Sequence, residues 1–161
     1  MNKIWAPWRI KYIQQHKQKN CIFCLCAKNK KIDKKQFVII RSKHSISLLN
    51  IYPYNNGHFM ACPKRHVKNI EDLNKEEFLD LWQVLKQTKK LIQTTLKPEG
   101  YNIGVNLGKV SGAGIDKHLH IHVVPRWTGD TNFMPVIANT KVISQSLRAL
   151  YNKLTKNNKN G

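Results

Sequence analysis

The sequence predicts an α+β domain built on a mainly antiparallel five-stranded sheet. Short runs of β-branched and large apolar residues lie on both sides of a single long helical pattern, without regular alternation of strand and helix. No repeat, long linker or low-complexity block divides the 161 residues. Because one domain has about 150 residues, we expect residues 1–161 to form a single domain.

Three strands are expected in the first half of the chain. Residues 37–40 and 45–49 are short runs rich in Ile, Val and Leu, and the polar segment 41–44 between them indicates a hairpin. A third run covers residues 59–62 and ends at Pro63, because proline cannot donate a backbone hydrogen bond to a neighbouring strand.

One long helix follows these strands. Asn74 and Glu77 have the spacing of a capping box, and apolar residues then recur at helical spacing up to Pro98, which predicts a helix over 74–96. The remaining elements are strands at 101–107 and 118–124 and a short C-terminal helix carrying Leu147, Leu150, Tyr151 and Leu154. We expect the chain from Lys153 onward to be a solvated, frayed terminus.

Three histidines occupy alternate positions of the last predicted strand. Since side chains alternate between the two faces of a strand, His118, His120 and His122 share one face at intervals of about 7 Å. Such a row suits either a metal ion or a polyphosphate, whereas three unrelated core histidines would each need a separate hydrogen-bond partner. The Gly-rich loop 106–114 precedes the row and is suited to presenting backbone N–H groups to an anion.

The four cysteines are either metal ligands or plain thiols, since disulfides are uncommon in the cytoplasm. Cys21 and Cys24 have the two-residue gap that lets both thiolates bind one tetrahedral ion. No second C-x-x-C pair exists, so histidines must complete the ligand set. Cys26, on the same loop, is an alternative to Cys24, and Cys62 is expected to be a buried strand residue.

The amino-acid composition excludes some classes of protein. With 41% hydrophobic and 23% charged residues the chain is neither disordered nor fibrous. No apolar run approaches the ~20 residues of a membrane span, and the N-terminus lacks a signal-peptide pattern, so we expect a cytoplasmic protein without membrane contact.

The net charge of +19 suggests phosphate-bearing partners, but its distribution is uneven. Residues 1–35 hold 10 basic and 1 acidic side chains, and residues 141–161 hold 5 and 0. A zinc-containing basic RNA-binding module and an interaction protein whose histidines only hold metal are therefore the competing hypotheses. No pair of closely spaced strand aromatics resembles an RNA-binding platform, so we expect no specific nucleic-acid partner.

The histidine row, the stretch 49–66 and the helix at 74–96 together resemble the histidine triad (HIT) superfamily of nucleotide hydrolases and transferases. The resemblance covers residues 21 to about 137 and implies the HIT fold, with basic extensions at both ends. Residues 5–9 and 125–135 are similar to the bacterial branch of diadenosine tetraphosphate phosphorylases. The resemblance implies a homodimer acting on dinucleoside polyphosphates, with an adenosine phosphoramidase of the same superfamily as the alternative.

The resemblance also implies roles for individual residues. His120 becomes the nucleophile on the α-phosphate, and water or inorganic phosphate resolves the nucleotidyl-histidine without a catalytic metal. His122 donates a hydrogen bond to phosphate oxygens. The implied nucleotide-binding residues are Asn50 at the ribose, Asn106 at the phosphates, and the N–H groups of Gly112, Ala113 and Gly114. One departure is Ile115-Asp116-Lys117, where many hydrolases have Gln followed by Ser or Thr, so the resemblance leaves open how the leaving group is held.

Zinc-bearing members of the superfamily use residues that correspond to Cys21, Cys24, His66 and His118. Four protein ligands close the coordination shell, so the implied zinc is structural. Outside this region, Ile4, Trp8 and Tyr12 share one helical face, which favours packing or a dimer contact.

Overall fold

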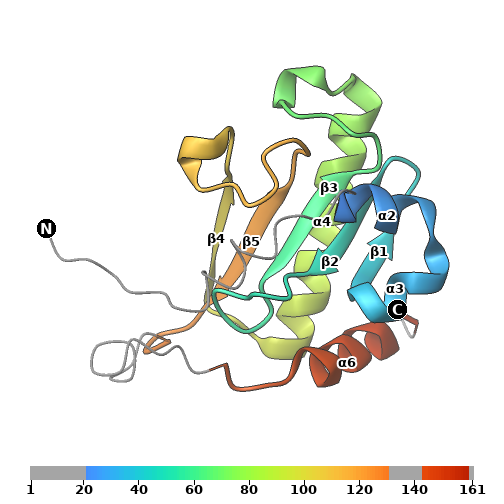
Figure 1. Ribbon diagram of the computed structural model, residues 1–161. Helices are drawn as coiled ribbons and strands as arrows, with labels where there is room; N and C mark the ends of the chain where they lie inside the picture. Colours follow the sequence, from blue (N-terminus) through green and yellow to red (C-terminus); the bar gives the residue numbers. More distant parts are fainter. Residues whose placement is uncertain (1–20, 131–142, 160–161) are drawn as a thin grey trace, which may run out of the picture.

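The computed structural model describes residues 21–130 and 143–159, and its centre is a five-stranded sheet in the order β1-β2-β3-β5-β4 (Figure 1). All neighbouring strands are antiparallel. The strands are β1 (Val38–Arg41), β2 (Ser45–Leu49), β3 (Phe59–Pro63), β4 (Gly100–Val105) and β5 (Ile121–Arg126). This confirms the predicted α+β class.

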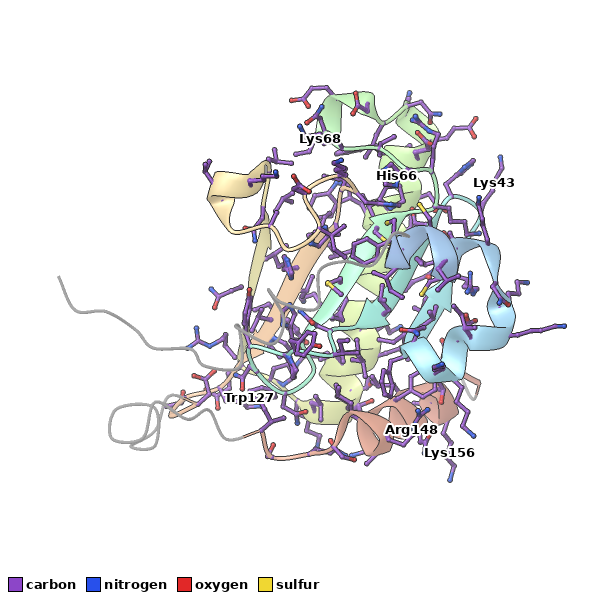
Figure 2. All side chains as sticks on the ribbon, in the orientation of Figure 1. Lys43, His66, Lys68, Trp127, Arg148 and Lys156 are labelled. Carbon is purple, nitrogen blue, oxygen red and sulfur yellow. The ribbon has the colours of Figure 1, made fainter. Side chains whose placement is uncertain are left out.

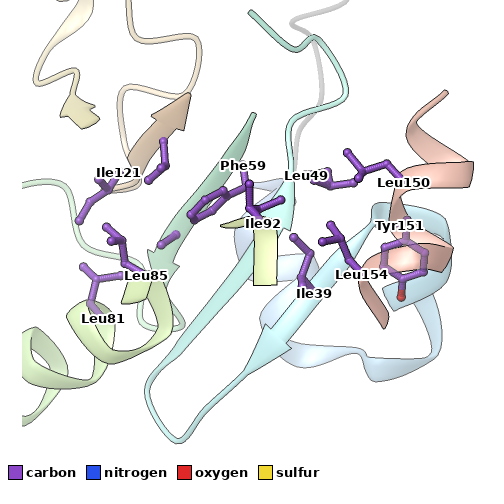
Figure 3. Close-up of a cluster of buried hydrophobic side chains, with 12 residues drawn as sticks. Ile39, Leu49, Phe59, Leu81, Leu85, Ile92, Ile121, Leu150, Tyr151 and Leu154 are labelled. Atoms are coloured by element: carbon purple, nitrogen blue, oxygen red, sulfur yellow. The ribbon is translucent and has the colours of Figure 1, made fainter. Parts of the chain in front are cut away.

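Helices α4 (Lys75–Leu96) and α6 (Leu147–Lys159) supply the apolar side chains that cover one face of the sheet. Arg148 and Lys156 on α6 are charged and exposed, whereas Leu150 and Leu154 are buried (Figure 2). The resulting core joins both helices to the sheet (Figure 3) and contains Ile39, Leu49, Phe59, Ala61, Leu81, Leu85, Ile92, Ile121, Val123, Leu150, Tyr151 and Leu154.

Among the described residues, the helices on the opposite face lie at its β1–β2 end. There α2 (Ile22–Lys28), the 3-10 turn η1 (Lys30–Ile32) and α3 (Asp33–Gln36) pack over the strands (Figure 1). Phe23 and Cys26 of α2 join Ile46 and Cys62 in a second apolar cluster. Residues 22–36 give no helical prediction from the sequence, since these helices are too short for a periodic pattern.

The predicted long helix is confirmed together with its cap. Asn74 accepts a hydrogen bond from the Glu77 N–H at 2.9 Å, and the Glu77 carboxylate accepts one from the Asn74 N–H at 3.1 Å. The helix ends where Lys97 adopts a left-handed conformation (φ 49°), directly before Pro98. Two further 3-10 turns are η2 (Ile70–Asp72) and η3 (Lys109–Ser111).

Some predicted boundaries were wrong. β5 begins at Ile121, so His118 and His120 precede the strand, and β4 ends at Val105 rather than at residue 107. β3 retains Pro63, which pairs with Ser45 at the end of the strand. Proline is tolerated at the end of a strand because its missing N–H does not interrupt the hydrogen bonds within the ladder.

The C-terminal helix is confirmed, but the expectation of a frayed end from Lys153 was wrong. Leu154 is fully buried, and Lys153 Nζ donates to the Thr95 carbonyl at 3.3 Å. Residues 4–12 and 131–135 lie outside the described residues. Within the described ranges, no helix has the length and apolar character needed to cross a bilayer.

Candidate active site and metal centre

Two thiols and two imidazoles meet where β3 ends and β5 begins. Cys21 and Cys24 come from the start of α2, His66 follows β3, and His118 precedes β5 (Figure 2 labels His66). One ligand atom from each side chain lies within 4.8 Å of all the others. Cys21 Sγ is 3.3 Å and His66 Nδ1 is 3.2 Å from His118 Nδ1, and Cys24 Sγ is 3.1 Å from His66 Nδ1.

The donor set fits a metal ion. Bonds of about 2.0–2.3 Å to nitrogen and sulfur place tetrahedral ligand atoms roughly 3–4 Å apart, as the atoms are here. His118 Nε2 lies 2.8 Å from the Pro63 carbonyl, so Nε2 carries the proton and Nδ1 presents its lone pair to the cluster. Burial, with smaller effects from His66 and His120, lowers the pKa of His118 to about 4, which favours the neutral ligand form.

The sulfur donors are those of Cys21 and Cys24 rather than Cys26. The Cys26 side chain is fully buried in the apolar cluster of α2, and Cys62 is buried on β3 as predicted. Burial and the adjacent Cys21 raise the pKa of the Cys24 thiol to about 11, so a nearby cation is needed to hold it as thiolate.

The ring of His120 is oriented by the backbone two residues before it. Its Nδ1 lies 2.8 Å from the His118 carbonyl oxygen, which only a protonated Nδ1 can contact favourably. In the neutral ring Nε2 therefore holds the lone pair. Burial lowers the pKa of His120, and Phe23 packs against the ring with centroids 5.0 Å apart. A neutral imidazole with one free nitrogen is suited to nucleophilic attack.

His122 has the opposite tautomer, which follows from its contact with His58. The Tyr54 N–H donates to His58 Nδ1 at 3.0 Å, so the proton of neutral His58 is on Nε2. That Nε2 lies 3.0 Å from His122 Nδ1, which accepts, and the His122 proton is then on Nε2 as a donor. Burial, with a smaller effect of His120, lowers the pKa of His122 to about 4.

His120 and His122 form a pair of neighbouring imidazoles. The rings of His120 and His122 are 4.8 Å apart. Val105 pairs with Ile121, so the next residues along, Asn106 and His120, are neighbours. The strand register thus places Asn106 beside the start of β5, and its role at the phosphates stays a prediction.

Two other predicted nucleotide-binding residues, Asn50 and Gly112, form hydrogen bonds to residues near them in the sequence. Asn50 Oδ1 accepts from the Tyr52 N–H at 2.9 Å, and its Nδ2 is 3.4 Å from His58 Nδ1. The Gly112 N–H donates to the Lys109 carbonyl at 3.1 Å, which closes the turn η3. Ala113 and Gly114 follow in the loop.

Residues of the unusual 115–117 segment lie on the metal side. Asp116 and Lys117 line an open cavity of about 600 Å³ together with Arg65, His66 and Lys68. Ile115 packs against the apolar cluster of α2.

Sequence reasoning missed His58 and Phe23 as site residues. His58 is fully buried beside His122, and Phe23 is fully buried between His118 and His120. His58 could have been found from strand period, since it precedes Met60 and Cys62 by two and four residues. Phe23 gave no comparable signal.

The family is decided by a match to the model of the HIT domain, which covers residues 31–129. This chain belongs to the HIT domain family. The matched range holds His66 and all three triad histidines but not Cys21 or Cys24.

Two curated relatives of this HIT protein bear names for different reactions. An AP-4-A phosphorylase of Mycobacterium tuberculosis is 36% identical over 155 residues, which cover 92% of this chain and 80% of the relative. An adenosine 5′-monophosphoramidase of Schizosaccharomyces pombe is 30% identical over 107 residues, covering 66% and 74%.

Solved structures agree on the fold. The crystal structure of a Zn-bound histidine triad family protein from Mycobacterium smegmatis has a TM-score of 0.66 and 24% identity, and the match covers 85% of this chain and 91% of that one.

Proposed function

We propose that this HIT protein cleaves dinucleoside polyphosphates through a nucleotidyl-histidine on His120. The observation that carries the proposal is the contact of His120 Nδ1 with the His118 carbonyl, which leaves Nε2 as the free nitrogen. The 36% identity to an AP-4-A phosphorylase across most of both chains supports the same substrate class.

In the first step, His120 Nε2 attacks the α-phosphorus of diadenosine tetraphosphate. A P–N bond forms and the P–O bond to the remaining polyphosphate breaks, so that ATP leaves with the bonding electron pair. His122 Nε2–H donates to a phosphate oxygen, and Asn106 with the N–H groups of Gly112, Ala113 and Gly114 binds the charge that develops.

In the second step, the P–N bond breaks. Attack by water gives AMP, and attack by inorganic phosphate gives ADP, so each route returns His120 to its neutral form after proton loss by the acceptor. When substrate binds, the Asn50 side chain gives up its hydrogen bonds to Tyr52 and His58 and binds the ribose hydroxyls instead.

Product analysis tests the proposal. Diadenosine tetraphosphate is supplied with and without inorganic phosphate, and products are separated by chromatography. ADP that forms only with phosphate identifies phosphorolysis, and AMP without phosphate identifies hydrolysis. Cleavage of adenosine 5′-phosphoramidate alone would instead support the phosphoramidase alternative, which the Schizosaccharomyces relative favours.

We also propose that the metal held by Cys21, Cys24, His66 and His118 is zinc. Two sulfur and two imidazole donors are a set that zinc prefers, and four protein ligands leave no open position for substrate. When bound, zinc supplies structural cross-linking rather than reaction chemistry. Its effect on catalysis is to fix His118, whose carbonyl orients His120. The free thiols of the described cysteines suit the reducing cytoplasm.

A second copy of the chain is the proposed protein partner. Phe78, Trp82 and Ile103 are 42%, 40% and 46% exposed. Trp82 and Lys89 share a face of α4, and the Lys89 Nζ lies over the Tyr101 ring of β4, so the apolar side chains border the junction between helix and edge strand. Apolar side chains grouped beside a sheet edge are typical of an interface.

The dimer is tested by light scattering with size separation. The wild-type chain should have twice the monomer mass, and Trp82→Glu should shift it toward the monomer. Leu25→Glu, which alters a similarly exposed apolar residue on α2, is the control. A wild-type monomer at micromolar concentration contradicts this part of the proposal.

A further inference from the structure

The edge strand β4 turns alternate residues toward the histidines. The Tyr101 hydroxyl donates to Gln93 Oε1 of α4 at 2.9 Å, so the odd-numbered residues of β4 face the helix. Val105 also packs against the core on that side. Because strand side chains alternate, residues 102 and 104 face the opposite side, which carries His122.

Gly104 leaves a space beside His122. The two residues are direct partners in the antiparallel pair of β4 and β5. A Cβ atom built on Gly104 meets no heavy atom within 4 Å. On this side of His122, the neighbouring strand therefore contributes only backbone.

Aromatic side chains lie against His120 and His122 on their other sides. Phe23 lies against His120, with ring centroids 5.0 Å apart. His58 and Tyr54 lie 5.2 Å and 6.1 Å from the ring of His122. On the β4 side, by contrast, Gly104 places no side chain beside the ring of His122.

We propose that Gly104 is a specificity-determining residue whose missing side chain admits a bulky leaving group. The inference rests on the proposed function. Asn50 is next to His58, on the β2–β3 side, so a nucleoside bound there directs the rest of a polyphosphate to the β4 side. A side chain at position 104 would stand in that path, while a substrate with a one-atom leaving group would not reach it.

The test variant is Gly104→Val, and Gly100→Val is its matched control. Both glycines lie on β4, face the same side, have no left-handed backbone angle and have open space around an added Cβ. Valine is favourable in strands, so both variants should fold. Gly100 pairs with Arg126, about 13 Å along the strand from Gly104, and does not adjoin the histidines.

Two substrates distinguish a blocked path from a damaged site. For Gly104→Val, kcat/KM with diadenosine tetraphosphate should fall on the order of tenfold or more. Turnover of adenosine 5′-phosphorofluoridate, from which only fluoride leaves, should stay within about twofold of wild type, by the same steric argument. Gly100→Val should match wild type with both substrates.

A binding experiment keeps the inference testable without turnover. Gly104→Val should weaken the binding of a non-hydrolysable methylene analogue of diadenosine tetraphosphate and leave the binding of AMP unchanged. Equal losses for both ligands or both substrates, or no loss at all, would overturn the role of Gly104. A wild-type protein that cleaves neither substrate would refute the proposed function instead, and the binding comparison would still decide about Gly104.

Discussion

The triad histidines do not all carry the proton on the same ring nitrogen, which is Nε2 in His118 and His122 and Nδ1 in His120. His118 and His120 are set by backbone carbonyls, those of Pro63 and His118, whereas His122 is set by His58. In the proposed function, one sequence pattern thus supplies a metal ligand, a nucleophile and a hydrogen-bond donor. The difference comes from the partner of each ring and not from its position in the motif.

Replacing His120 with alanine should abolish nucleotide cleavage and leave the fold and metal content intact, since its Nε2 is the proposed nucleophile and the side chain is not one of the proposed metal ligands. His122→Ala should be slower than wild type by about 10²–10³, because it loses a stabilising donor. Steady-state kinetics measure both effects, with circular dichroism as the control for folding. Turnover near the wild-type rate in His120→Ala would refute the covalent mechanism.

His58 should act only through His122. His58→Phe fills the same buried space but removes the N–H that fixes the His122 tautomer. We expect kcat to fall and KM to change little. The double variant with His122→Ala should be no slower than His122→Ala alone, and additive losses in this cycle would show that His58 acts independently.

At the scale of elements, α2 packs on the sheet and begins with two of the four proposed metal ligands, Cys21 and Cys24. Replacing Cys21 and Cys24 with serine should remove the metal and lower the unfolding temperature, because a structural metal contributes to the free energy of folding. Elemental analysis and thermal unfolding measure the two effects. Cys26→Ala is the control and should keep the metal; protein purified without chelator that contains no zinc would contradict the site.

The start of α4 should make stability depend on pH. Hydrogen bonding from Arg65, more than any other cause, lowers the pKa of Glu77 to about 2, below its ordinary value of 4.5. The stabilisation is complete above the unfolded pKa and disappears as the pH falls toward 2. Glutamine preserves the capping box, so the unfolding temperatures of wild type and Glu77→Gln should differ most at pH 7, approach each other below pH 4.5 and converge only near pH 2. A gap that is independent of pH would contradict the charge effect.

Most elements could be predicted because their signals are local. The capping box of α4, the alternation around His122 and the apolar positions of α6 each lie within a few residues. The elements of residues 22–36 could not, since α2 and α3 have 7 and 4 residues and owe their place to tertiary contacts. Likewise the metal ligands were implied by resemblance, whereas the His58 contact depends on an approach across the sheet.

At the scale of the whole molecule, the charge of +19 should not make the protein a general nucleic-acid binder. The excess is concentrated in residues 1–35 and 141–161, while Lys109 and Lys117 flank the predicted phosphate loop. Salt should therefore weaken capture of a dinucleoside polyphosphate only modestly. Affinities for single-stranded RNA and duplex DNA, measured from 50 to 200 mM salt, should be weak; tight binding that falls by roughly 10³–10⁵ over that range would support the RNA-binding alternative.

The buried position of Leu154 changes what a C-terminal truncation would do. Removing residues from 153 onward takes away a core side chain as well as lysines, so the loss would be one of stability. Neutralising exposed Lys156 by Lys156→Gln tests the charge without disturbing the core, and turnover should be unchanged.

The distant origin of the metal ligands has a consequence for synthesis of the chain. Cys24 and His118 are separated by 94 residues, which a ribosome adds in about 5–20 s at 5–20 residues per second. The two N-terminal thiols emerge first and have no complete set of partners until β4 and the loop after it have been translated. Closure of the centre is therefore a late event on the ribosome, and the nascent chain carries reactive, unmetallated cysteines throughout most of its synthesis.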